Sequence, residues 1–173
     1  MGTDSGAYKV VLVLHLMSAI VGFGGMAVNG YYGAHAASRR GREGAAVGEA
    51  VHRGYSFSEW FVYAVPIFGI VLILLSDDLF KFSQLWISLS FVLYIAFMGV
   101  LHGVQLPTVR RINVLLAEMA SGGAGATGEG GSGAPPQVAE LDELGAKAGV
   151  FGGILNLLGV VVVCLMVFKP GFP

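Results

Sequence analysis

The sequence predicts an all-α, polytopic membrane protein: a four-transmembrane-helix bundle with cytoplasmic helical extensions. Composition is the first reason, because 55% of the 173 residues are hydrophobic and only 12% are charged, whereas soluble domains average about 25% charged residues. The second reason is a set of four apolar runs, each close to the roughly 20 residues that a spanning helix needs. The length favours a single domain, residues 1–173. A net charge of −1 provides no electrostatic case for nucleic-acid binding.

The four predicted spans cover, in order, about residues 8–32, 57–75, 85–106 and 148–168. None of them alternates between polar and apolar residues, as a membrane-spanning β-strand does. The first run is too long for a signal peptide, and three more spans follow it. Besides Lys9 at the edge of the first run, the strongly polar residues in the runs include His15, Asn29, Glu59, His102 and Asn156. Because ionisable residues are costly in hydrocarbon, the histidines and the glutamate are the first candidates for function.

The lysines and arginines predict how the chain is oriented, because positively charged loops stay in the cytoplasm. Seven lie in the two longer loops, namely Arg39, Arg40, Arg42, Arg53, Arg110, Arg111 and Lys147. Three lie on the other side, namely Lys9, Lys81 and Lys169. We therefore expect both termini outside a bacterial cytoplasmic (inner) membrane, with the longer loops inside. The aromatic residues near the span ends fit interfacial anchors; they are Tyr8, Tyr31, Tyr32, Trp60 and Trp86.

The longer loops carry helical patterns of their own. One helical face beyond the third span is apolar, and so is one before the fourth; the residues are Ile112, Leu115, Leu116, Met119, Val138, Leu141 and Leu144. Between these two segments, residues 121–136 read SGGAGATGEGGSGAPP, a composition typical of a flexible linker. The sequence thus predicts a cytoplasmic helical hairpin with a flexible tip. The first loop, rich in alanine and charged residues, is a further candidate helix.

Spans one and four each carry a stripe of small and polar residues at helical spacing. The stripe of span one follows His15 and comprises Ser18, Gly22, Gly25 and Asn29. The stripe of span four comprises Gly145, Gly149, Gly152, Asn156 and Gly159. Membrane helices associate where small residues allow close approach and polar residues form hydrogen bonds. Both stripes are therefore predicted packing faces, directed at neighbouring helices or at each other.

Depth in the membrane separates His15 from His102. At 1.5 Å per residue, the two side chains lie roughly 18 Å apart along the membrane normal. Metal–ligand bonds near 2 Å exclude one shared ion, so each histidine is a candidate cofactor ligand at its own depth. Glu59 lies close to the depth of His102, and the two form a candidate proton-titrating pair. The plainer interpretation is a hydrogen-bonded pair without a further role.

Two short motifs resemble a known family. LHLMSAIVGFGG at Leu14–Gly25 resembles the opening of predicted bacterial four-span membrane proteins of unknown function, and LMVFKPGF at residues 165–172 resembles their C-terminal end. The matching residues are His15, Gly24, Gly25, Lys169 and Pro170. Phe23 and Gly24 stand where that family often has a tryptophan before the double glycine. The opening is also distantly similar to the copper-resistance D membrane domain and to small bundles that hold haem b, which would place function on His15 and His102.

Three functions remain open from the sequence. The first is a non-enzymatic membrane component that contacts the lipid bilayer and packs with itself or with a larger membrane complex. The second is a haem b- or metal-binding bundle in electron transfer or copper handling, with His15 or His102 as ligands. The third is a proton-coupled transporter that uses Glu59 and His102. No common catalytic or nucleotide-binding motif is present, so we expect no catalytic residues.

Overall fold

The computed structural model describes residues 2–38, 41–122 and 136–171. The regular elements of these residues are all helical: α1 (Gly6–Ser38), α2 (Gly41–Leu75), α3 (Leu85–Val100), the π-helical turn η1 (Leu101–Gln105), α4 (Leu106–Gly122) and α5 (Pro136–Phe168). Four helical runs are long and apolar enough to cross a membrane. The predicted fold class, an all-α four-helix membrane protein, is confirmed. The predicted linker at 121–136 lies almost wholly outside the described residues.

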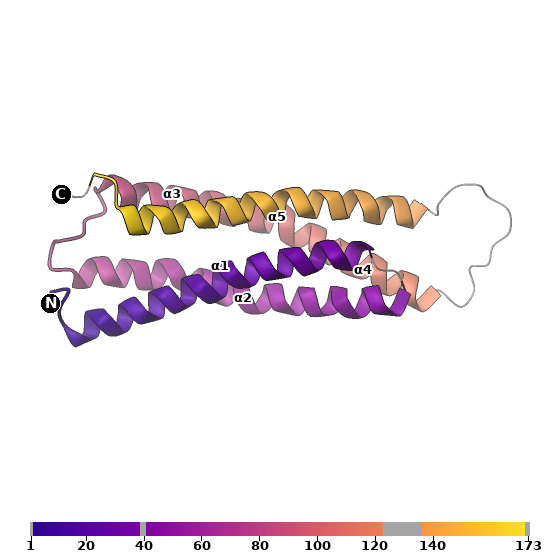
Figure 1. Cartoon of the computed structure of the whole chain (residues 1–173), viewed down its shortest axis with the longest axis horizontal. Helices are drawn as coiled ribbons and strands as arrows, with labels where there is room; N and C mark the ends of the chain where they lie inside the picture. The colour runs from indigo at the N-terminus through magenta and orange to yellow at the C-terminus, as the bar shows by residue number, and fades with distance from the viewer. Residues whose placement is uncertain (1, 39–40, 123–135, 172–173) are drawn as a thin grey trace.

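The bundle is built from two helical pairs. Figure 1 shows α1 beside α2 and α3 beside α5, with both chain ends at the same end of the bundle. We call this end the termini end and the opposite one the loop end. Contacts between α1 and α5 and between α2 and α4 join the two pairs. An even number of crossings requires that both chain ends lie on one side of a membrane.

The helices extend beyond the thickness of a bilayer. The 33 residues of α1 correspond to about 50 Å of helix, whereas the hydrocarbon core is about 30 Å thick. At the loop end the extensions of α2, α4 and α5 pack around one buried cluster, formed by Ile112, Leu115, Leu116 and Leu141. On its surface, the Arg111 guanidinium donates hydrogen bonds of 2.7 and 3.1 Å to the Glu140 carboxylate. The amphipathic segments of the sequence thus form the packed end of the bundle.

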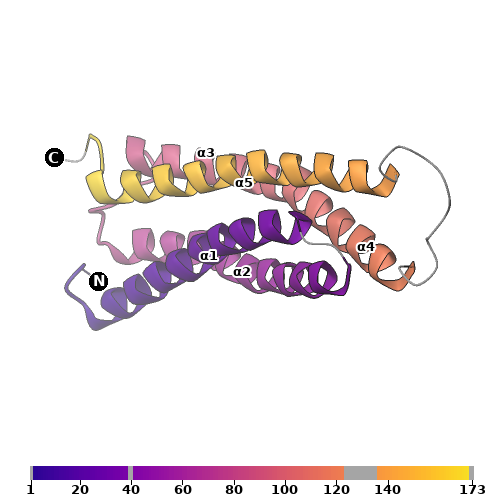
Figure 2. The same cartoon turned by 45° about the vertical axis from the view of Figure 1, so that its right-hand side comes forward.

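Two prolines shape the helices that carry polar residues. Pro66 lies inside α2 and has no N–H for the carbonyl of Val62, four residues earlier. The Tyr94 hydroxyl of α3 donates to that carbonyl at 3.2 Å. Before Pro107, the Leu106 N–H bonds to the Leu101 carbonyl five residues back, which makes the π-helical turn η1. Figure 2 shows α4 turned away from the line of α3 after this point.

The stripe of α1 faces α2. A Cβ added at Gly22 would lie 2.9 Å from the backbone nitrogen of Val62, so the two backbones nearly touch there. One turn further on, Gly25 lies against the Ser58 side chain, and Asn29 lies against Gly54. Ser18 of the same stripe is buried. The small residues therefore allow α1 and α2 to cross closely.

The stripe of α5 divides between two faces. Gly152 and Gly159 point inward, where an added Cβ would lie 3.6 Å from Gln105 Nε2 and 3.5 Å from the Phe23 ring. Gly149 and Asn156 are exposed at the surface of the bundle. At about 100° per residue, the five stripe positions cover an arc of about 80° around the helix. One side of this arc contacts the rest of the bundle, and the other side is exposed. The remaining stripe residue, Gly145, is half-buried.

Candidate functional site

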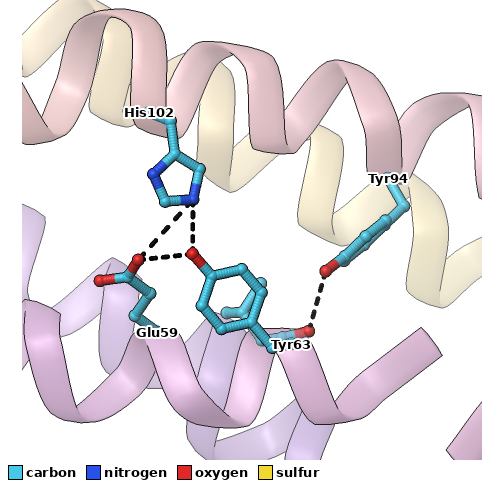
Figure 3. Close-up of polar contacts among 5 residues, drawn as sticks. Glu59, Tyr63, Tyr94 and His102 are labelled. Atoms are coloured by element: carbon cyan, nitrogen blue, oxygen red, sulfur yellow. Dashed lines mark hydrogen bonds and ion pairs between the residues drawn. The ribbon is translucent and has the colours of Figure 1, made fainter. Parts of the chain in front are cut away.

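A polar cluster joins α2 to the π-helical turn η1. Its members are Glu59 and Tyr63, one turn apart on α2, and His102 (Figure 3). The Tyr63 hydroxyl donates to Glu59 Oε1 at 2.6 Å and lies 2.8 Å from His102 Nε2. Glu59 Oε1 and His102 Nε2 are 3.7 Å apart. The structure thus brings the two residues of the candidate proton-titrating pair together, with Tyr63 between them.

The hydrogens of this cluster follow from its partners. The single hydrogen of the Tyr63 hydroxyl is directed to Glu59, so His102 Nε2 carries a hydrogen and donates it to the Tyr63 oxygen. The rings of Tyr63 and His102 stack with an interplanar angle of 8° and centroids 5.9 Å apart. The result is a continuous chain of hydrogen bonds from His102 through Tyr63 to Glu59. Chemically, such a chain can hold a proton and pass it between its ends.

The cluster lies at the side of the bundle. The His102 side chain is 41% exposed and that of Glu59 21%. Trp60, which directly follows Glu59, is 75% exposed, as expected for an aromatic anchor at a membrane interface. Tyr63 was not part of the predicted pair, although its i, i+4 spacing from Glu59 places both side chains on one helical face.

A second feature is an apolar cleft of about 260 Å³ in the termini half of the bundle. All four spanning helices contribute to its walls, and aromatic rings are prominent among the lining residues, including Phe23, Phe80, Trp86, Phe91 and Tyr94. Tyr8 and Trp86, predicted as interfacial anchors, are instead buried in these walls. The Lys169 amine lies 4.8 Å from the centroid of the Phe80 ring and 5.7 Å from that of Trp86. Aromatic residues from a span end and from inside the spans thus build this cleft together.

His15 is part of the wall of this cleft. Its Nδ1 lies 2.9 Å from the Val65 carbonyl oxygen, next to the proline of α2. A carbonyl oxygen only accepts, so Nδ1 carries the ring hydrogen, and in the neutral ring Nε2 is an acceptor. Gly69 makes room for the imidazole, because an added Cβ would lie 3.3 Å from His15 Cε1. Among the described residues, none hydrogen-bonds to Nε2.

A groove of about 430 Å³ follows the contact between α1 and α5. It is lined by Gly24 and Ala27 of α1 and by Asn156, Val160 and Cys164 of α5, among others. Asn156 is exposed, and no described residue forms a hydrogen bond with its side chain. Among the described residues, no atom outside the glycine's own stretch of helix lies within 4 Å of a Cβ added at Gly24, Gly149 or Gly153. This side of α5 is therefore open, with an amide at its centre.

The two histidines predicted as cofactor ligands are not brought together. His15 lies in the cleft of the termini half, whereas His102 belongs to the polar cluster beside α2. Within the described ranges, no group of three or more histidine, cysteine, aspartate or glutamate residues is placed to hold a metal ion. The roles of His15 and His102 as haem or metal ligands therefore stay predictions.

The fold places the protein in the class of polytopic helical membrane proteins, with polar groups held between the spans. Over residues 9–170 the chain matches the family described as "predicted integral membrane protein (DUF2269)". Since the match covers nearly the whole chain, the protein belongs to this family. Comparisons with curated proteins and with solved structures found no match. The family description assigns no activity, so function has to be argued from the geometry.

Proposed function

We propose that the protein is a non-enzymatic membrane component that associates with a second copy of itself through the open side of α5. The proposal rests mainly on the position of Asn156. This residue lies about 3 Å from the centre of the fourth predicted span, is exposed, and has no hydrogen-bond partner among the described residues. An amide in hydrocarbon without a partner is strongly unfavourable. A partner that covers α5 removes that cost.

A second copy supplies a matching partner. An asparagine amide both donates and accepts, so two Asn156 side chains related by a twofold axis satisfy each other. Gly149 and Gly153 form a GxxxG pair on the same exposed side, and glycines at this spacing let membrane helices approach closely. The groove beside α1 offers space for side chains of the second copy. Small residues and one self-complementary amide therefore support a symmetric dimer.

The orientation is part of the same proposal. Seven of the ten lysines and arginines lie in the two longer loops, which favours the loop end inside and both termini outside a bacterial cytoplasmic membrane. In this orientation two copies in one membrane meet side by side with Asn156 at equal depth. A larger membrane complex that uses the same side of α5 is the alternative partner.

Disulfide trapping between two copies tests the proposal. The starting variant is Cys164→Ser, which removes the only cysteine, and Val160→Cys then places a thiol on the exposed side of α5 one turn from Asn156. Oxidation in native membranes is expected to yield a crosslinked dimer. Ile95→Cys, on the equally exposed surface of α3, is the control and should remain monomeric.

The same trap measures the contribution of the interface residues. Adding Asn156→Leu or Gly149→Leu to the Val160→Cys variant should abolish most of the crosslink. Gly99→Leu is the matched control, because Gly99 also has open space around it but lies on α3. Gly152→Leu is unsuitable, since its side chain would collide with Gln105 inside one protomer. Equal crosslinking at Val160→Cys and Ile95→Cys would refute the proposal.

The polar cluster supports a second candidate function, the coupling of proton binding to transport. The continuous hydrogen-bond chain from His102 through Tyr63 to Glu59 favours it. In proteoliposomes with a trapped pH dye, the wild type should carry a proton flux that Glu59→Gln and Tyr63→Phe each reduce. A flux equal to that of protein-free liposomes would exclude this candidate.

A further inference from the structure

The cleft in the termini half of the bundle has the features of a ligand site inside one protomer. Its volume of about 260 Å³ exceeds that of engineered apolar cavities of about 150 Å³ that take up benzene. It is thus large enough for one substituted aromatic ring and is at the lower limit of ordinary small-molecule pockets. The prominence of aromatic side chains in its walls favours a flat, apolar ligand that stacks against rings.

The cleft is open toward lipid. Leu16, Val163 and Val167 line it and are also exposed at the surface of the bundle between α1 and α5. A molecule dissolved in the bilayer can therefore enter from the side, and a tail on its ring can remain among lipid chains. A strongly polar or charged molecule would lose its hydration on this route without gaining partners.

His15 provides an acceptor in the wall that a ligand can reach, whereas the buried Trp86 Nε1, which also has no hydrogen-bond partner among the described residues, can only donate. The Ser90 hydroxyl donates to the Trp86 carbonyl, and the Tyr94 hydroxyl donates to the Val62 carbonyl. His15 Nδ1 is held by the Val65 carbonyl, so Nε2 is the nitrogen that a ligand can reach, and it accepts a hydrogen bond in the neutral ring. The matching ligand group is a donor, and on an apolar ring that donor is a hydroxyl.

We propose that the cleft binds a lipid-soluble phenol, whose ring stacks among the aromatic residues and whose hydroxyl donates to His15 Nε2. Quinols are natural members of this chemical class. The bond between His15 and Val65 fixes the imidazole in the required tautomer and orientation, so the acceptor is in place before the ligand arrives. The site lies within one protomer, although Val163 lines both this cleft and the groove that would face a second copy.

The test compares para-butylphenol with its methyl ether, which has a similar shape but no hydroxyl hydrogen. Trp86 lines the cleft, and Trp60→Phe makes it the only tryptophan. Binding to the full chain in detergent is followed by Trp86 fluorescence, excited at a wavelength where the phenol does not absorb. The phenol should bind about three- to tenfold more tightly than the ether, as expected for one hydrogen bond.

His15 variants decide which group is responsible. His15→Phe keeps a flat ring but removes the acceptor, so the preference for the phenol should fall to about one. His15→Gln retains an acceptor and should keep part of the preference. Circular dichroism and gel filtration report folding of each variant. Equal binding of the two compounds to the wild-type cleft, no response of Trp86 to either, or an unchanged preference in folded His15→Phe would overturn the proposal.

Discussion

The crossing of α1 and α2 at Gly22 is expected to tolerate no side chain. An alanine Cβ at this position would lie 2.9 Å from the Val62 nitrogen and 3.0 Å from Val62 Cγ2. Ordinary contact begins at 3.4 Å, so the helices must separate by about 0.5 Å. A gap of this size forfeits at least a quarter of the dispersion energy of the facing atoms, and overpacking typically costs 1–3 kcal/mol. We expect Gly22→Ala to lower the free energy of unfolding by about 2 kcal/mol.

The matched control is Gly99→Ala on α3, where an added Cβ would have no neighbour within 4 Å in the part of the chain that the structure describes. That change should leave stability unchanged or raise it by up to about 1 kcal/mol, because alanine favours the helix over glycine. Unfolding of both variants in mixed micelles, with increasing amounts of denaturing detergent, can be followed by circular dichroism. Equal stability of Gly22→Ala and Gly99→Ala would show that the close crossing does not hold the two helices together.

Three further predictions concern the polar groups. Tyr94→Phe leaves the Val62 carbonyl without its donor and should lower the free energy of unfolding by about 0.6 kcal/mol, and by at most about 2 kcal/mol. In a Pro66→Ala background the introduced alanine supplies the missing N–H, so the same change should lower the free energy of unfolding much less. Tyr63→Phe removes both hydrogen bonds of the bridge and should shift the NMR resonance of the His102 Nε2 nitrogen at a fixed pH, whereas Phe61→Leu should not. Under the self-association proposal, purified folded protein should have no Soret band and no stoichiometric metal, and a haem spectrum lost in His15→Ala would favour the cofactor alternative instead.

The predictions from sequence succeeded where composition and periodicity carry the information. An apolar run long enough to cross a bilayer can satisfy its backbone hydrogen bonds there only as a helix or in a closed barrel. Because the runs do not alternate between polar and apolar residues, the helix is the remaining choice. The apolar faces before and after residues 121–136 have one helical period, and most of their residues meet in the buried cluster at the loop end. The family match over residues 9–170 agrees with the two short motifs at the ends of the chain.

The sequence could not predict which residues contact each other across helices. The stripe of α1 was visible, but whether it meets α2 or α5 depends on how four helices pack in three dimensions. The stripe of α5 looked like one face, yet Gly152 is buried and Asn156 is exposed. A rotation of a few tens of degrees decides between these environments, and no pattern within one helix specifies it.

The sequence by itself determined four apolar helices, their order and their polar positions, because these properties depend on each segment alone. Only the tertiary structure decided which polar groups meet. It placed Tyr63 between Glu59 and His102, because the π-helical turn before Pro107 sets the rotation of His102. It also directed His15 to the Val65 carbonyl, since Gly69, one turn further along α2, leaves space for the imidazole. Contacts between segments far apart in the chain depend on how the helices rotate and cross, and packing of the whole bundle sets both.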